Sequence, residues 1–236
     1  MSEASLISGV LNFRDTGGLR AGDAVTRSGV LFRSGALAGA DADGLRALAA
    51  LRLRRIVDLR DDDELRWAPS PAGEAEVVRV PLFAGSVDSF FAESVTLQGL
   101  YASIVEDSAS RVVDVVRAVL ADQPVLVHCT VGKDRTGVTV ALTLAAAGVD
   151  EDAVITDYAR TESLLPEERN RAIVQRLKRL IPSSTTVEEL ATRSPAPVMR
   201  ALLEDLTVRY GAPVEFLRAH GLADDEIVEL RRILIC

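Results

Sequence analysis

The chain has 236 residues, of which 48% are hydrophobic and 26% are charged. A chain of this size can bury a substantial core, so we expect one domain over residues 1–236. Its formal net charge is -8 at pH 7. This acidic balance argues against nucleic acid as a partner, because proteins bind that polyanion through basic surfaces that release its counterions.

The cysteines and histidines are few. Cys129 lies within a motif and Cys236 is the last residue, which does not resemble a disulfide framework and fits a reducing, cytoplasmic setting. With only His128 and His220 beside them, no His/Cys cluster with metal-ligand spacing can form, although carboxylate sites for magnesium or calcium stay open. We therefore expect chemistry that needs no metal and no cofactor.

Neither the N-terminus nor the longest apolar stretch predicts a membrane or export signal. Residues 1–15 lack the basic start and continuous apolar core of a signal peptide. Residues 137–149 are too few to span a bilayer and predict a buried helix instead. We expect a cytoplasmic protein without a transmembrane segment, with unconventional export left open.

Short β-branched apolar runs alternate with helical patterns over the first 150 residues, which predicts an α/β fold. Asp41 is placed to cap one helix, and residues 110–120 carry valine and leucine at helical spacing. We expect a mostly parallel sheet flanked by helices. The predicted strands are residues 30–32, 55–59, 77–82 and 125–128.

The pattern after Asp150 is wholly helical, with segments at 151–164, 166–181, 186–192, 195–210, 213–220 and 224–234. Residues 181–197 are rich in Ser, Thr and Pro around one short helix, a composition typical of a mobile crossing. Two interpretations stay open. One is a helical lid over residues 181–210, and the other is a plain surface connection.

The most informative segment covers residues 125–137, Val-Leu-Val-His-Cys-Thr-Val-Gly-Lys-Asp-Arg-Thr-Gly. A predicted strand enters a glycine-containing loop that opens into an apolar helix, and the loop contains Cys-x5-Arg. Inward-pointing backbone N–H groups and the positive helix N-terminus would form a cradle for one phosphate. The alternative is a buried structural cysteine followed by an arginine at this spacing by chance.

Two residues of this segment carry the expected chemistry. A helix N-terminus and a nearby arginine lower a thiol pKa from about 8.5 into roughly the range 3.5 to 7.5, so Cys129 is the expected thiolate nucleophile. Arg135 is the expected clamp, since a planar guanidinium holds two phosphoryl oxygens at once. The other expected phosphate-binding residues are Thr130, Val131, Gly132, Lys133 and Thr136.

Several loop residues have more specific expected roles. Gly132 would allow a backbone conformation that other residues disfavour, and Gly137 would let the helix pack closely on the sheet. Thr136 is expected to donate a hydrogen bond to the Cys129 sulfur. His128 is expected to anchor the loop backbone, with a satisfied buried histidine as the alternative.

Lys133 has two interpretations. It is one of only two lysines in the chain, which hints at a specific need for it. A flexible charge beside the loop could meet a second phosphate on an inositol ring, whereas the alternative is a solvent-facing residue with no role in binding.

Residues 128–137, His-Cys-Thr-Val-Gly-Lys-Asp-Arg-Thr-Gly, resemble the signature of the protein tyrosine phosphatases, specifically their atypical bacterial branch. Residues 12–19, 31–35, 56–60 and 157–160 resemble further motifs of that family in the expected order. The resemblance implies a tyrosine-phosphatase-like fold with a helical lid. It also implies hydrolysis of phosphotyrosine, and often of phosphoserine, phosphothreonine or phosphoinositides, with inorganic phosphate as the product.

Two aspartates compete for the role of general acid. The resemblance implies Asp134 within the loop. Asp58 competes, because it lies near the end of a predicted parallel strand, where sites of open α/β sheets gather, although we favour a supporting role for it. Arg14 and Arg60 would scaffold the loop or contact the substrate phosphate, as would other motif residues. Residues 61–64 are expected to form a solvated acidic loop.

Three functions stay open at this point. The leading hypothesis is a tyrosine or dual-specificity phosphatase that acts through a phosphocysteine intermediate. A phosphoinositide phosphatase would use the same loop, and the partners would then be lipids rather than phosphotyrosine proteins. The third hypothesis is an inactive phosphate-binding interaction module.

Overall fold

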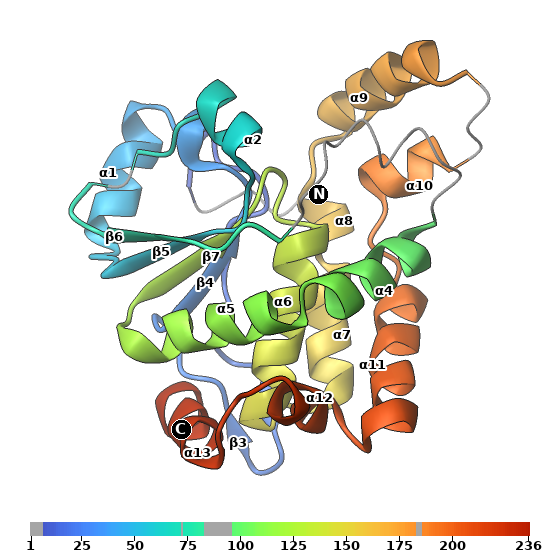
Figure 1. The fold of residues 1–236 in the computed structure, drawn as a ribbon. Coiled ribbons are helices and arrows are strands. Elements are labelled where there is room, and N and C mark those ends of the chain that lie inside the picture. Colours follow the sequence, from blue (N-terminus) through green and yellow to red (C-terminus); the bar gives the residue numbers. More distant parts are fainter. Residues whose placement is uncertain (1–6, 72, 83–95, 183–185) are drawn as a thin grey trace.

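Short hydrophobic strands form a five-stranded sheet in the computed structural model, which describes residues 7–71, 73–82, 96–182 and 186–236 (Figure 1). The strand order is β1-β4-β7-β5-β6, in which β1 is antiparallel to β4 and the other neighbours are parallel. This confirms the expected α/β fold with a mostly parallel sheet. The strands are β1 (Arg14–Asp15), β4 (Leu31–Ser34), β5 (Arg55–Asp58), β6 (Glu76–Arg79) and β7 (Val125–His128), with a separate hairpin of β2 (Arg20–Ala21) and β3 (Ala24–Val25).

Side chains alternate between the two faces of the sheet, as the strand repeat of two residues requires. On β7, Leu126 packs into a cluster with Leu48 of α1 (Ala42–Ala50), while Val125 and Val127 belong to a larger cluster on the opposite face. Both faces of β7 are therefore buried, which explains its continuous apolar run.

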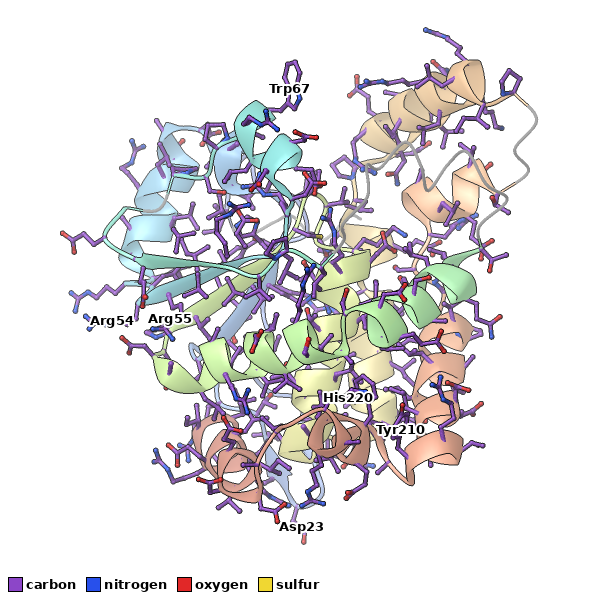
Figure 2. All side chains as sticks on the ribbon, in the orientation of Figure 1. Asp23, Arg54, Arg55, Trp67, Tyr210 and His220 are labelled. Atoms are coloured by element: carbon purple, nitrogen blue, oxygen red, sulfur yellow. The ribbon has the colours of Figure 1, made fainter. Side chains whose placement is uncertain are left out.

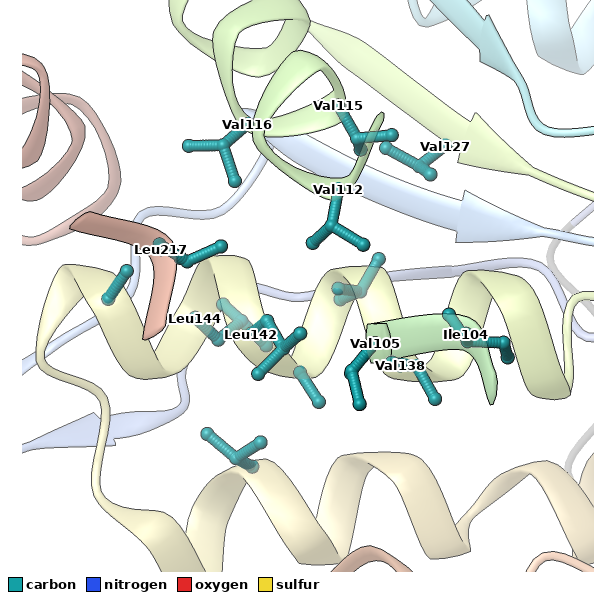
Figure 3. Close-up of a cluster of buried hydrophobic side chains, with 14 of the residues drawn as sticks. Ile104, Val105, Val112, Val115, Val116, Val127, Val138, Leu142, Leu144 and Leu217 are labelled. Carbon is teal, nitrogen blue, oxygen red and sulfur yellow. The ribbon is translucent and has the colours of Figure 1, made fainter. Parts of the chain in front are cut away.

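The larger cluster encloses α6 (Asp134–Ala147) among other helices. Figure 3 shows Val115 of α5 (Ala109–Ala121) beside Val127 of β7, and Val105 of α4 (Leu97–Asp107) beside Val138 of α6. Helix α6 is buried almost all round, so its polar side chains need internal partners. Thr139 and Thr143 donate to the carbonyls of Arg135 and Thr139, one turn earlier, at 2.8 and 2.7 Å. The surrounding helices are α4, α5, α7 (Glu151–Ala159), α11 (Ala196–Tyr210), α12 (Pro213–Ala219) and α13 (Asp224–Leu234).

Two helices lie at the edge of the main core, and one of them contributes a buried residue, Leu190, to the larger cluster. Helix α8 (Thr161–Leu164) leads to α9 (Glu167–Leu180), which packs against α10 (Val187–Thr192) beside the upper end of α6 (Figure 1). Leu177 of α9 forms a small cluster of its own with Val187 and Ala191 of α10.

The two helices within residues 181–210 therefore differ in how they are packed. Met199, Leu202 and Leu206 of α11 are buried in the larger cluster, so the second half of this range belongs to the core. A lid stays a prediction only for the first half of this range, which contains α10. Among the described residues, no helix is both long and apolar enough to cross a membrane.

Candidate active site

The register of the parallel strands brings three strand ends to one edge of the sheet. His128, the last residue of β7, lies opposite Ser34 of β4 and Asp58 of β5. Ligand sites of parallel sheets gather at this carboxyl edge. Cys129 follows directly, and α6 begins five residues later at Asp134. The Cys-x5-Arg loop therefore joins the central strand to the buried helix α6.

Gly132 shapes this loop. Its φ is +74°, and its backbone N–H donates to the sulfur of Cys129 over 3.3 Å. A Cβ atom at this position would lie 2.4 Å from the carbonyl carbon and oxygen of Ser34. Both the positive φ and the close approach to β4 therefore require glycine.

Polar side chains from the N-terminal part of the chain hold the back of the loop. Asn12 Nδ2 and Arg33 Nη2 donate to the carbonyl oxygen of Gly132 at 2.7 and 3.1 Å. Asp157 of α7 binds Arg33 at 2.7 Å and Arg14 at 2.8 Å, and all three side chains are buried. Burial opposes the charge of Asp157, but the two arginines outweigh it and lower its pKa. Arg14 thus supports Asn12 and Asp157 from behind the loop.

Asp58 lies beneath the loop and is fully buried. Its carboxylate binds Arg60 Nε and Nη2 at 2.9 and 2.7 Å. Burial raises the pKa of Asp58, but the hydrogen bonds from Arg60 and the nearby His128 ring lower it by more, so the net shift of this pKa is downward. His128 in turn contacts the carbonyl of Cys129 through Nδ1 at 3.2 Å. This geometry favours an ionised supporting role for Asp58 over proton donation.

Arg135 is paired with Glu64 of α2 (Asp62–Trp67). Its Nη1 and Nη2 each lie 2.6 Å from one oxygen of that carboxylate, which also accepts a hydrogen bond from Thr130 Oγ1. Burial raises the pKa of Glu64, but Arg135 lowers it more, to about 2. The expectation of a loop at residues 61–64 is wrong, because they begin α2, although Asp62 and Asp63 are exposed to solvent as expected. Asp61 caps α2 in a reciprocal capping box, and this directs Glu64 to the clamp.

Asp134, in the first turn of α6, meets two donors. Tyr101 Oη donates to its Oδ1 at 2.9 Å, and Lys133 Nζ lies 2.7 Å from the same oxygen. Lys133 also donates to the carbonyl of Arg193, just after α10, at 3.0 Å. Its side chain is 2% exposed, so the solvent-facing interpretation of Lys133 is wrong, while its role towards a second phosphate stays a prediction. Buried packing with two acceptors fixes the ammonium group instead.

A family model described as "Tyrosine phosphatase family" matches residues 6–236. The chain belongs to the tyrosine phosphatase family. It is 27% identical to the triple specificity protein phosphatase PtpB of Mycobacterium tuberculosis, over 97% of this chain and 98% of that protein. It is 28% identical to a tyrosine-protein phosphatase of Nostoc commune, over 89% of this chain and 73% of that one.

A solved structure is also weakly similar to this phosphatase. The core catalytic domain of the PP-IP phosphatase SIW14 from S. cerevisiae superposes with a TM-score of 0.41 and 16% identity, over 78% of this chain and 93% of that one.

Two expectations about the phosphatase loop need correction. Thr136 Oγ1 is buried and has no hydrogen-bond partner within the described ranges, so the expected bond to the Cys129 sulfur is not formed here. The second correction concerns Gly137, which lies close to helix α7 as well as to the sheet. A Cβ atom there would lie 3.1 Å from the Tyr158 ring of α7 and 3.5 Å from Arg33, so the close packing is against α7.

Trp67 and His220 are not among the side chains that hold the loop. Figure 2 shows Trp67 projecting from the end of α2 into solvent, where it is 89% exposed. His220 packs between Tyr210 and Phe216, remote from the loop. In the part of the chain that the structure describes, no three His, Cys, Asp or Glu side chains converge in a way that would hold a metal ion.

Sequence reasoning missed Glu64 and Tyr101 as partners of the site. The capping-box spacing of Asp61 and Glu64 marks the start of a helix, but it does not indicate that Glu64 pairs with Arg135. No local signal marks Tyr101, whose contact with Asp134 depends on how α4 packs beside α6.

Proposed function

We propose that this phosphatase hydrolyses phosphotyrosine in proteins, with a specificity that extends to other phosphorylated residues. Cys129 is the nucleophile and Arg135 the phosphate clamp. The mycobacterial relative is named a triple specificity protein phosphatase, which supports the wider range. The observation that carries the proposal is the Cys129 sulfur, 3.3 Å from the Gly132 N–H in a loop that runs into α6.

The mechanism has two displacements at phosphorus. In the first, the Cys129 thiolate forms an S–P bond while the P–O ester bond breaks, and Asp134 gives its proton to the leaving oxygen. In the second, Asp134 takes a proton from water as the water oxygen attacks phosphorus. The S–P bond breaks, and inorganic phosphate and the thiolate are released.

Electrostatics stabilise both transition states. The α6 N-terminus and the guanidinium of Arg135 offer positive charge to the equatorial phosphoryl oxygens. Arg135 carries a raised pKa, since its pairing with Glu64 outweighs the cost of burial. The guanidinium is therefore cationic throughout the cycle.

The first test replaces the nucleophile. Cys129→Ser should abolish turnover of a phosphotyrosine peptide while inorganic phosphate still binds, because the cradle remains but a serine hydroxyl stays protonated. Chelators should have no effect. Turnover by the serine variant, or activity lost to a chelator and restored by metal, contradicts this mechanism. An inactive binding module would show no turnover in the unmodified protein.

The second test assigns the acid by leaving-group dependence. Asp134→Asn should lower turnover of aryl phosphates with weakly acidic phenols by about 100-fold to 10,000-fold, with a much smaller loss for a strongly acidic nitrophenol. Asp58→Asn should lower both to a similar extent, because it loosens the loop from below. A leaving-group-dependent defect in Asp58→Asn alone would reverse the assignment.

Phosphoinositides have less support as substrates. The argument for them rested on a flexible Lys133 beside the loop, whereas this side chain is buried against Asp134 and the Arg193 carbonyl. A panel of phosphotyrosine, phosphoserine and phosphoinositide substrates, with Cys129→Ser as the control, distinguishes these classes.

A further inference from the structure

Tyr101 reaches the candidate acid from a helix that carries no residue of the loop. It lies on α4, 33 residues before Asp134, and is fully buried. A buried tyrosine hydroxyl needs a hydrogen-bond partner, and this one is 2.9 Å from Asp134 Oδ1. A purely structural tyrosine in this core would not need to end on a carboxylate at the site.

The direction of this hydrogen bond follows from which groups carry a proton to donate. A tyrosine hydroxyl has one proton to donate. Burial and the nearby Asp134 carboxylate raise the pKa of both Tyr101 and Tyr158, so both stay neutral at pH 7. Tyr101 therefore donates to Asp134, and Tyr158 Oη, 2.7 Å away, donates to Tyr101.

The two oxygens of the carboxyl group have different surroundings. Oδ1 accepts from Tyr101 and lies 2.7 Å from Lys133 Nζ. Oδ2 has no hydrogen bond to any residue within the described ranges. Two donors on Oδ1 favour the proton on Oδ2 and prevent the carboxyl group from rotating.

We propose that Tyr101 is a positioning residue for the general acid. It holds Oδ1 of Asp134 so that Oδ2 presents its proton to the leaving oxygen, and it stabilises the carboxylate once the proton has left. This inference rests on the proposed role of Asp134. Tyr158 orients the Tyr101 hydroxyl, and within the described ranges it makes no hydrogen bond to the acid.

The experiment compares Tyr101→Phe with Tyr158→Phe, two removals of one buried hydroxyl from adjacent rings. A hydrogen bond to a charged group is worth enough that Tyr101→Phe should lower kcat/KM by about 10-fold to 100-fold for an aryl phosphate with a weakly acidic phenol. The loss for a strongly acidic nitrophenol should be much smaller. Tyr158→Phe should show little of this dependence, and both variants should bind inorganic phosphate as the unmodified protein does.

A double-mutant cycle with Asp134→Asn separates positioning from a general structural defect. When Asp134 is already replaced, Tyr101→Phe should cause no further leaving-group-dependent loss. If the losses multiply, or if Tyr101→Phe lowers turnover of both esters equally, the inference is overturned while the acid stands. If Asp134→Asn itself shows no leaving-group dependence, both the acid and its positioning residue are overturned.

Folding of the variants is checked by circular dichroism. Tyr101→Phe leaves the Tyr158 hydroxyl buried without its partner, so the double variant Tyr101→Phe/Tyr158→Phe removes both hydroxyls. It should show the same leaving-group-dependent loss as Tyr101→Phe. Wild-type turnover of the weakly acidic phenol ester by this double variant contradicts the inference.

Discussion

Replacement of Gly132 by alanine tests whether the loop depends on close contact with the neighbouring strand. The added Cβ would lie 2.4 Å from the Ser34 carbonyl group and 2.6 Å from the Gly35 nitrogen. All of these are backbone atoms at the end of β4, so no side chain can rotate away to make room. The loop must move instead, and its contacts with Asn12, Arg33 and the Cys129 sulfur move with it.

Two costs add at this position. An L-residue in the left-handed region costs about 1–2 kcal/mol, and overpacking a well-packed site costs typically about 1–3 kcal/mol more. The free energy of unfolding should therefore fall by roughly 2–5 kcal/mol in Gly132→Ala. Misplacement of reacting groups by about 1 Å costs around 100-fold in rate, so kcat/KM should fall at least that far.

Gly22 provides the matched control. It lies in the turn between β2 and β3 with a φ of +65°, and a Cβ atom there would have no neighbour within 4 Å. Gly22→Ala should therefore cost only the backbone strain, about 1–2 kcal/mol, and leave kcat/KM unchanged. Urea unfolding and steady-state kinetics measure both variants. Equal destabilisation by the two substitutions, or full activity of Gly132→Ala, would refute this reasoning.

Three further outcomes are expected. The pKa of Glu64 falls from 4.5 to about 2, so its pairing with Arg135 stabilises the fold fully above pH 4.5 and is lost as the pH falls towards 2. After solvent screening, Glu64→Gln should lower the free energy of unfolding by about 1–2 kcal/mol at pH 7, as measured by urea unfolding. If the difference in unfolding free energy between the variant and the unmodified protein does not narrow below pH 4.5, the pairing with Arg135 is contradicted. Asp157→Asn leaves buried arginines without their carboxylate and should lower the free energy of unfolding by about 3–5 kcal/mol. Asp150→Asn, at an exposed pair, should have little effect, and equal destabilisation by the two variants would contradict this contrast. Lys133→Met should lower phosphotyrosine and phosphoinositide turnover by the same factor, about tenfold or more, and a loss confined to the lipid would restore a role for Lys133 in binding a second phosphate.

The loop could be predicted from the sequence because its parts are neighbours in the chain. The apolar run of β7, Gly132 and the start of α6 lie within residues 125–137. The strand end, a glycine with positive φ and a helix N-terminus are local features, and each has a residue pattern that identifies it. The same argument predicted the parallel sheet, since β-branched runs between helical patterns form parallel strands.

The partners of the loop depended on tertiary structure. Glu64 lies 71 residues before Arg135, within an acidic run whose pattern indicated only solvent exposure. Lys133 appeared mobile because lysine usually is, yet the carbonyl of Arg193, 60 residues later, holds it in the interior. Tyr101 has an ordinary core pattern on α4.

Sequence by itself therefore determined the fold class, the family and the segment that contains Cys129 and Arg135. Only the tertiary structure decided which carboxylate faces Arg135, which hydroxyl holds Asp134 and which charges support the loop from behind. The physical reason is the distance along the chain over which each feature is specified. A helix start and a glycine turn are specified within a few residues, whereas a buried ion pair forms only where separate elements pack together and exclude water.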